Sequence, residues 1–584
     1  MHGLGEEVSA KVPLPEIPFA SVGELISARA AIDPARVAVR SRIASGKWAD
    51  LTWGALDEKR RSVSGGLAAL GVARGDRVAI VSHNSVEMLI AELAIVSLGA
   101  VSVPVFPDYA PEILQHCIAD SGARVAFAGS AVQQHRLAAC RGIQAVVVLD
   151  DQPLAGGLPF KALQGGAPVD AQPALDDVAF HLYTSGTTGK PKGVLLSHRN
   201  VLSQQAAIGA VWDVSEQDVF LSYLPWHHCF GAFFERFMAL WNRALLVLDD
   251  SRGRDLKALL ANFAEVQPTV YFSVPRVYQA IVRRASEDPA AGRSIFHPRL
   301  RFVFTAAAPL DAHCYRFFEE RSVPVHEGWG LTETSPCATL TRPDAPRVAG
   351  VVGWPLPGTL VRLDAVTGLP ESERGSGTGE ILVRGPQVML GYHRLSGDDV
   401  LRDGWLRTGD LGEWTEHGLR VRGRVDGVFK LQNGEKVASA EVEARILAAT
   451  PLLEQAVVLG RGQAFVTALC WISPGAARRF LEERAVDVPD SLPALCASPE
   501  LRRAVAEALQ SANLLSPVHH ERVRRVALVT SPLSLEEGEL TPTMKVVRGA
   551  VERRNAALIA ALAGEGPHEQ VVDISRGGDA FTNV

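Results

Sequence analysis

The chain has 584 residues, which is too long for a single hydrophobic core and suggests roughly three or four domain-sized units. Its content of 47% hydrophobic and 21% charged residues is that of an ordinary globular protein. The formal net charge of −6 at pH 7 argues against non-specific binding to nucleic acid or to an anionic membrane.

The N-terminal segment does not have the pattern of a secretory signal, because residues 1–18 contain glutamates and no apolar stretch. The most apolar run, residues 88–106, carries Glu92, Gly99 and Pro104. These residues favour a buried helix leading into a strand over a transmembrane segment. Seven scattered cysteines form no C-x-x-C pair, so we expect neither a disulfide framework nor a zinc site. We predict a cytoplasmic protein without a transmembrane segment.

Helix and strand patterns alternate from residue 20 to 170 and again from 176 to about 350. Amphipathic helices are predicted at 19–31 and 56–70. Short apolar strands are predicted at 78–81, 101–105, 245–248, 269–273 and 302–305. This alternation indicates an α/β fold with mostly parallel sheets.

The pattern changes between residues 350 and 423 to short alternating strands with glycine-rich turns, as in Gly379 to Gly385. Such strands predict a small antiparallel barrel or sheet. Beyond Arg424 we expect a compact α+β region with a helix-rich stretch from 474 to 520. The last twenty residues are polar and are predicted to be loosely held.

A loop rich in glycine, hydroxyl groups and lysine is predicted at residues 183–194, with the sequence YTSGTTGKPKGV. Its glycines allow the backbone to approach a ligand closely, and its hydroxyl and N–H groups can surround an anion. Lys190 and Lys192 add positive charge, and apolar runs on both sides place the loop between two strands. We therefore predict a polyphosphate-binding loop. Its predicted ligand-binding residues are Thr184, Ser185, Gly186, Thr187, Thr188, Gly189 and Lys190.

This loop is not a Walker P-loop, because its glycine spacing differs and Pro191 follows Lys190. It resembles instead the signature of the adenylate-forming superfamily, which includes acyl-CoA synthetases, luciferases and nonribosomal adenylation domains. The resemblance implies attack of a carboxylate on the α-phosphate of ATP with loss of pyrophosphate. It extends from residue 75 to Lys545. The long C-terminal region, with its ELTPTMK sequence at 539–545, is similar to the long-chain fatty acyl-CoA synthetase branch.

The resemblance also implies a domain organisation. The large N-terminal domain, residues 1–423, is expected to hold two stacked, mostly parallel α/β sheets and a small β-barrel at 350–423. A hinge at 424–426, with Asp426 as its pivot, would join this domain to a smaller, mobile α+β domain at 427–584.

A second motif, EGWGLTET at residues 327–334, places an aromatic ring between glycines and then a hydroxyl and a carboxylate. The resemblance implies that Trp329, where the family usually has tyrosine, lies on the adenine and that Thr332 contacts the α-phosphate. Glu333 would hold Mg²⁺, which needs few carboxylates because water and phosphate oxygens complete its shell. Thr184 is expected to be a second metal contact, and Thr184 and Glu333 are both predicted to be catalytic. Gly330 and Ala307 are also expected at the nucleotide.

Further residues are assigned from the resemblance in the second half of the chain. Asp410, in the tripeptide Thr408–Asp410, is expected to bind the ribose hydroxyls together with Arg424. Lys545 is expected to be the catalytic cation that bridges the attacking carboxylate and the α-phosphate. Lys430 and Gly434 lie in a stretch that resembles the loop lining the pantetheine tunnel, so we expect them to contact coenzyme A.

His228 is aligned with a family position that borders the acyl pocket, and we predict that it is catalytic by orienting the substrate carboxylate. A packed core histidine is an alternative interpretation, and the adjacent His227 leaves the alignment ambiguous by one position. Apolar residues follow, and they could line an acyl channel or simply pack a helix onto a sheet. They are Phe230, Phe233, Phe234, Phe237 and Met238.

The leading prediction is ATP- and Mg²⁺-dependent activation of a carboxylic acid, a medium- or long-chain fatty acid, to acyl-AMP, followed by thioester formation with coenzyme A. One alternative is an acyl- or aryl-AMP ligase that loads the phosphopantetheine thiol of a carrier protein. Another is a catalytically inactive nucleotide- or lipid-binding protein, although Lys545, Glu333 and Asp410 are all present.

Overall fold

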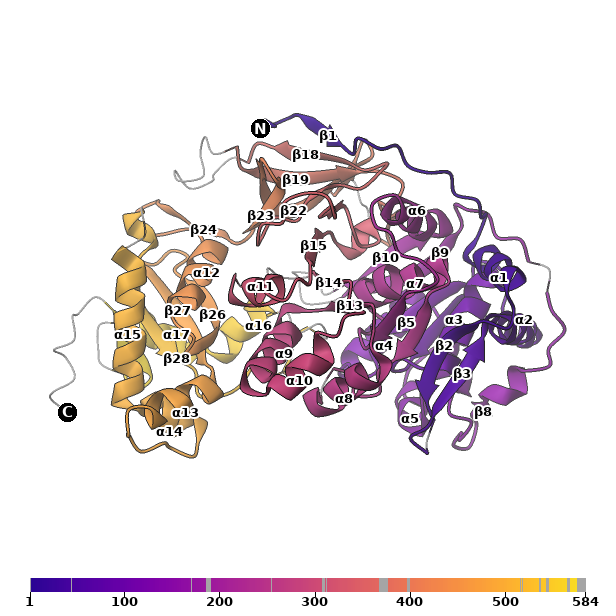
Figure 1. Ribbon diagram of the computed structural model, residues 1–584, viewed down its shortest axis with the longest axis horizontal. Coiled ribbons are helices and arrows are strands. Elements are labelled where there is room, and N and C mark those ends of the chain that lie inside the picture. The colour runs from indigo at the N-terminus through magenta and orange to yellow at the C-terminus, as the bar shows by residue number, and fades with distance from the viewer. Residues whose placement is uncertain are drawn as a thin grey trace.

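The computed structural model places two large sheets and a small antiparallel sheet in the N-terminal part and an α+β unit at the C-terminal end (Figure 1). The structure describes residues 2–43, 45–169, 171–184, 191–253, 255–306, 310, 312–366, 377–395, 400–514, 516, 518–534, 537–541, 546–564 and 568–574. The predicted α/β fold with mostly parallel sheets is confirmed. Among the described residues, no helix combines the length and apolar character that crossing a bilayer requires.

The first large sheet has eight strands in the order β20-β10-β9-β5-β4-β6-β7-β8. The strands from β9 to β8 pair in parallel, and β10 and β20 add antiparallel pairs at one edge. The strands are β4 Arg77–Val81, β5 Val101–Val105, β6 Val125–Ala128, β7 Ala145–Val148, β8 Leu158–Pro159, β9 Val178–Thr184, β10 Lys192–Ser197 and β20 Gly391–Tyr392. Helices near it are α3 Val86–Ser97, α4 Pro111–Ser121, α5 Ala131–Ala138 and α6 His198–Gly209. The run at 88–106 is therefore the predicted buried helix followed by a strand.

The second large sheet has nine strands in the order β17-β16-β15-β14-β13-β11-β12-β2-β3, and its six central strands are parallel. Its strands are β2 Val37–Arg42, β3 Trp48–Thr52, β11 Val219–Ser222, β12 Leu245–Leu248, β13 Val270–Ser273, β14 Phe302–Thr305, β15 Val325–Trp329, β16 Thr339–Leu340 and β17 Trp354–Pro355. Nearby helices are α1 Val22–Ile32, α2 Trp53–Ala69, α7 Phe237–Asn242, α8 Leu256–Val266, α9 Pro275–Glu287, α10 Pro289–Ile295 and α11 Ala312–Glu319.

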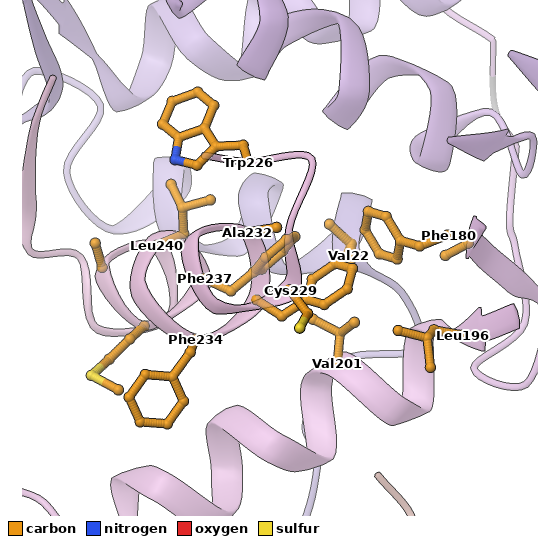
Figure 2. Packing of buried hydrophobic residues seen from close by; sticks show 14 of the residues in the cluster. Val22, Phe180, Leu196, Val201, Trp226, Cys229, Ala232, Phe234, Phe237 and Leu240 are labelled. Carbon is orange, nitrogen blue, oxygen red and sulfur yellow. The ribbon is translucent and has the colours of Figure 1, made fainter. Parts of the chain in front are cut away.

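One hydrophobic cluster contains buried side chains from both large sheets and from the helices between them. A π-helix, η2 Phe230–Arg236, contributes phenylalanines to this cluster, and all of its residues are buried. Figure 2 shows Phe234 and Phe237 around it, with Phe180 and Leu196 of the eight-stranded sheet close by. Its last residue, Arg236, forms a fully buried ion pair with Glu92 of α3.

The smaller sheet is antiparallel and follows the order β1-β18-β19-β22-β21, with β23 on β22. Its strands are β1 Glu7–Ser9, β18 Leu360–Asp364, β19 Gly379–Arg384, β21 Leu401–Arg402, β22 Trp405–Thr415 and β23 Gly418–Arg424. The predicted β-barrel at 350–423 is wrong, because this sheet is open in the described part of the chain. Its short outer strands β1 and β21 pair with β18 and β22, respectively, and not with each other among the described residues, so the sheet does not close.

The C-terminal region is α+β, as predicted, and has hydrophobic clusters of its own. A four-stranded sheet, β26-β27-β28-β29, is accompanied by the hairpin β24–β25. The elements are β24 Val428–Lys430, β25 Lys436–Ala438, α12 Ser439–Ala449, β26 Leu453–Leu459, β27 Val466–Ile472, α13 Pro474–Glu482, α14 Leu492–Ala497, α15 Pro499–Leu514, β28 Val523–Leu528, α16 Arg548–Arg554, α17 Ala556–Ala563 and β29 Val571–Asp573. Ion pairs link it to the N-terminal part, among them Arg422–Glu441 and Arg479–Glu287.

Candidate active site

The predicted phosphate loop lies between two paired strands of the eight-stranded sheet. Thr184, the last residue of β9, is opposite Lys192, the first residue of β10. A side chain at Gly193 would collide with the buried imidazole of His181, so only glycine fits there. Residues Ser185, Gly186, Thr187, Thr188, Gly189 and Lys190 lie outside the described residues.

Helix α4 contacts the chain on both sides of this loop. Nε2 of His116 lies 3.0 Å from the carbonyl oxygen of Pro191. Because a carbonyl only accepts, His116 carries its proton on Nε2 and donates it. The hydroxyl of Tyr183 lies 2.8 Å from Oδ2 of Asp120 on the same helix. The two strand ends that flank the loop are thereby tied to one helix.

A chain of three side chains connects β15 with the small antiparallel sheet. Nε1 of Trp329 donates to Oδ2 of Asp410 over 2.9 Å, and a guanidinium nitrogen of Arg424 donates to Oδ1 over 2.9 Å. Trp329 ends β15, Asp410 lies on β22, and Arg424 ends β23 opposite Asp410. The predicted adenine and ribose residues are therefore in direct contact. The indole N–H makes this contact, whereas a tyrosine would have only the O–H at the far end of its ring to donate.

Arg424, the last residue of this chain of contacts, is also the first residue of the predicted hinge at 424–426. Nε of Arg424 lies 3.6 Å from Oδ1 of Asp426, whose side chain is 59% exposed. Burial acts to lower the pKa of Arg424, but the carboxylates of Asp410 and Asp426 outweigh it and raise the pKa. The N–H of Val425 also donates to the carbonyl of Gly409. Arg424 thus stays charged between the carboxylates of Asp410, the predicted ribose-binding residue, and Asp426, the predicted pivot.

The second motif continues from β15 into a single helical turn, η3 Thr332–Thr334. Glu333 is half-buried there, and its Oε1 accepts a 2.6 Å hydrogen bond from the hydroxyl of Tyr392. Thr332 is buried, and its Oγ1 lies 3.3 Å from Sγ of Cys229. The carboxylate of Glu333 is an oxygen ligand of the kind that Mg²⁺ binds, and Mg²⁺ takes few such ligands from protein. Glu333 therefore fits the predicted magnesium site.

His228 lies two residues before the π-helix and next to Cys229, the residue that contacts Thr332. Its Nδ1 accepts from the N–H of Phe230 over 3.3 Å, so the neutral imidazole carries its proton on Nε2. His227 is buried against the ring of Phe106 instead. The phenylalanines that follow pack between the two sheets. The ring of Phe234, for example, stacks on the ring of Phe304 with 4.5 Å between the ring centres. This packing is one of the two interpretations that the sequence left open.

The first residue of the EGWGLTET motif, Glu327, is a buried carboxyl group with a shifted pKa. Burial raises the pKa of Glu327 to about 7, although the N–H groups of Gly350 and Leu310 donate to it. Glu327 therefore fixes the backbone at Leu310 and Gly350 against β15.

The remaining predicted residues are distributed as follows. Gly330 is half-buried directly after β15. Lys430 and Gly434 are exposed in the β24–β25 hairpin, where the carbonyl of Lys430 accepts from Gly462. Ala307 and Lys545 lie outside the described residues.

Two residues that contact the predicted site were not singled out from the sequence. Tyr392 comes from a two-residue strand, which has no periodicity to detect. Cys229 resembles any other buried cysteine in the sequence, although it stands beside His228. Both are found only because the fold brings distant segments together.

Comparison with known proteins identifies the family. The sequence model of the family described as AMP-binding enzyme matches residues 26–393, which is more than half of the chain. The family model of the AMP-binding enzyme C-terminal domain matches residues 426–563. The chain belongs to the AMP-binding enzyme family. The predicted membership of the adenylate-forming superfamily is thereby confirmed.

Relatives and solved structures agree with this family. The chain is 29% identical over 616 residues to a long-chain-fatty-acid–CoA ligase of Mycobacterium bovis, covering 95% of this chain and 99% of that one. A crystal structure of the anthranilate CoA ligase AuaEII with anthranoyl-AMP has a TM-score of 0.77 at 22% identity, covering 94% of this chain and 99% of that one. ATP-bound MatB from Rhodopseudomonas palustris has a TM-score of 0.72 at 25% identity, covering 92% and 99%.

We expect the carboxylate of Asp410 to be needed for nucleotide binding. Hydrogen bonds to a charged group contribute about 1.5–3 kcal/mol, so Asp410→Asn should weaken binding of a non-hydrolysable ATP analogue by about tenfold to 100-fold. Isothermal titration calorimetry measures this change. Asp364→Asn, which removes an ion-paired carboxylate from β18 of the same sheet, is the control. An unchanged dissociation constant for Asp410→Asn would contradict the ribose assignment.

Proposed function

We propose that this protein joins a medium- or long-chain fatty acid to coenzyme A through an acyl-adenylate. The observation that carries the proposal is the Trp329–Asp410–Arg424 chain of contacts, with Thr332 and Glu333 on the turn that follows Trp329. In a member of the AMP-binding enzyme family, this arrangement suits a bound nucleotide whose α-phosphate faces the carboxylate of the acid that is to be activated. The mycobacterial relative named as a long-chain-fatty-acid–CoA ligase supports the choice of acid and thiol.

The chemistry has two steps, and both balance without a further reactant. A carboxylate oxygen attacks the α-phosphorus of ATP, the bond to the β-phosphate oxygen breaks, and pyrophosphate leaves. The thiol sulfur of coenzyme A then attacks the acyl carbon of the mixed anhydride, the acyl–oxygen bond breaks, and AMP and the thiol proton are released.

Several of the predicted residues have roles in the first step. The ring of Trp329 supplies a flat surface for adenine, and Asp410 accepts from the ribose hydroxyls. The phosphate loop, Thr184 to Lys190, with Thr332 would bind the phosphates. Lys545 would bring the two negatively charged reactants together, since a fixed cation lowers the cost of their approach. His228, with its proton on Nε2, would donate to the fatty-acid carboxylate.

Magnesium would be held by Glu333 and Thr184, together with phosphate oxygens and water. When bound, the ion neutralises phosphate charge and so favours departure of pyrophosphate.

We also propose that the C-terminal domain, residues 427–584, moves about the hinge at 424–426 between the two steps. The separate hydrophobic clusters of that region support independent movement. The exposed Asp426 lies in the predicted hinge. Lys430 and Gly434 would then contact coenzyme A in the second pose.

Mass spectrometry of products tests this function. The protein is incubated with Mg-ATP and a mixture of fatty and aryl acids, with and without coenzyme A. We expect a fatty acyl-CoA that forms only when the thiol is present. Acyl-AMP that accumulates despite coenzyme A would indicate a carrier protein as the acceptor, and the absence of both products would indicate a nucleotide or lipid binder.

A further inference from the structure

The hydroxyl of Tyr392 contacts the carboxylate that the proposed function assigns to magnesium. It lies 2.6 Å from Oε1 of Glu333, which is a short hydrogen bond between an O–H donor and a charged acceptor. The two residues are 59 positions apart in the chain. The contact therefore depends on the tertiary fold and not on local sequence.

The strand that carries Tyr392 is short but is held at several points. In β20, Gly391 and Tyr392 pair with Leu195 and Val194 of β10. The next residue, His393, donates its N–H to the carbonyl of Gly193 over 2.7 Å. Nε2 of His393 lies 3.0 Å from the carbonyl of Asp120 at the end of α4, so the imidazole donates there as well. The backbone at Tyr392 is thus fixed against β10 and α4.

The ring of Tyr392 also connects the phosphate loop to Glu333. The ammonium group of Lys192, the first residue after Pro191, lies 5.5 Å from the centre of that ring. The phenol O–H of Tyr392 is the donor in its contact with the carboxylate of Glu333.

A carboxylate with one oxygen held by a donor has fewer orientations open to it. Outer-shell hydrogen bonds of this kind orient metal ligands, and their loss typically lowers metal affinity by about 10–100-fold. We infer that Tyr392 is a positioning residue that holds Oε1 of Glu333 and leaves the second oxygen for the magnesium ion. This inference rests on the proposed function. Because β20 pairs with β10, it also means that the strand after the phosphate loop fixes the metal ligand.

The substitution Tyr392→Phe removes the hydroxyl and keeps the ring. We expect Mn²⁺, used as a probe for Mg²⁺, to bind the variant with a non-hydrolysable ATP analogue about 10–100-fold more weakly than the wild type. Electron paramagnetic resonance of free Mn²⁺ measures this binding without turnover. In kinetics, the Mg²⁺ concentration for half-maximal acyl-AMP formation should rise by a similar factor, while the rate at saturating Mg²⁺ recovers.

Tyr278→Phe is the matched control. Its buried hydroxyl donates to the backbone carbonyls of Tyr271 and Phe304, so the variant loses a hydrogen bond that does not involve Glu333. We expect it to lower the thermal midpoint and leave Mn²⁺ affinity unchanged. Unchanged Mn²⁺ affinity in Tyr392→Phe, or an equal loss in both variants, would overturn the inference. A wild-type protein that binds no Mn²⁺ with the nucleotide would instead overturn the magnesium site of the proposed function.

Discussion

Replacing Lys545 by alanine is expected to lower the rate of acyl-AMP formation by about 10²–10³ and to spare thioester formation from supplied acyl-AMP. The first step brings a carboxylate to a triphosphate, and removal of one fixed electrostatic contact typically costs that factor. In the second step the thiol attacks an acyl carbon after the proposed domain movement, so we expect the lysine to be no longer needed. Acid-dependent exchange of pyrophosphate into ATP measures the first step, and conversion of synthetic acyl-AMP to acyl-CoA measures the second.

Lys257→Ala provides the control, because Lys257 is an exposed lysine on α8 of the N-terminal part. It should leave both rates unchanged. Equal loss of both half-reactions in Lys545→Ala would contradict the role assigned to Lys545, since that result indicates general damage to the protein.

The second large effect is on stability, and it concerns the ion pair between Glu92 and Arg236. The side chains of these residues are 1% and 0% exposed, respectively. Glu92→Ala would leave the guanidinium buried without its counter-charge, which typically costs about 3–5 kcal/mol. We expect a marked fall in the urea midpoint of the transition that reports on the N-terminal part, followed by fluorescence of its buried tryptophans.

Two further variants separate charge from packing. Asp50→Ala breaks the exposed pair with Arg40 and should cost less than about 1 kcal/mol. The double variant Glu92→Leu/Arg236→Met replaces the pair by apolar groups and should recover much of the loss, because such replacements are often neutral or stabilising. A Glu92→Ala protein that unfolds at the wild-type urea concentration would show that the pair contributes nothing.

The strands of the large sheets could be predicted closely from sequence. Apolar runs at 78–81, 101–105 and 302–305 correspond to β4, β5 and β14, because parallel strands buried on both faces are continuously apolar. Strand β1 was not predicted, since three residues, Glu-Val-Ser, show no pattern. The barrel prediction failed because closure depends on which outer strands pair, and the local alternation at 350–423 does not contain that information.

The π-helix illustrates another limit of sequence reasoning. Charged residues usually lie at the surface, so Glu235 and Arg236 would be expected to end the buried segment. Both are buried, because Glu92 of α3 neutralises Arg236 and Ser222 donates to the carboxyl group of Glu235. Burial raises the pKa of Glu235, which favours its neutral form. A partner more than 100 positions away in the sequence cannot be identified from local composition.

Some residues of the candidate site could also be predicted from the sequence, and others could not. Trp329, Asp410 and Arg424 were predicted one motif at a time from a family resemblance, and the structure brings all three into contact. Their contact follows from the fold, because β15 belongs to the nine-stranded sheet and β22 and β23 belong to the small antiparallel sheet. Tyr392, which donates to Glu333, belongs to no such motif. Its contact with Glu333 is found only in the structure, where β20 pairs with β10.

The most direct test of the central claim is acid-dependent exchange of labelled pyrophosphate into ATP in the absence of coenzyme A. If acyl-AMP forms reversibly from a fatty acid and ATP, label from pyrophosphate should enter ATP. We expect this exchange to require both the acid and Mg²⁺ and to need no thiol. Release of ADP and phosphate, or the absence of exchange with every fatty acid tried, would contradict activation through acyl-AMP.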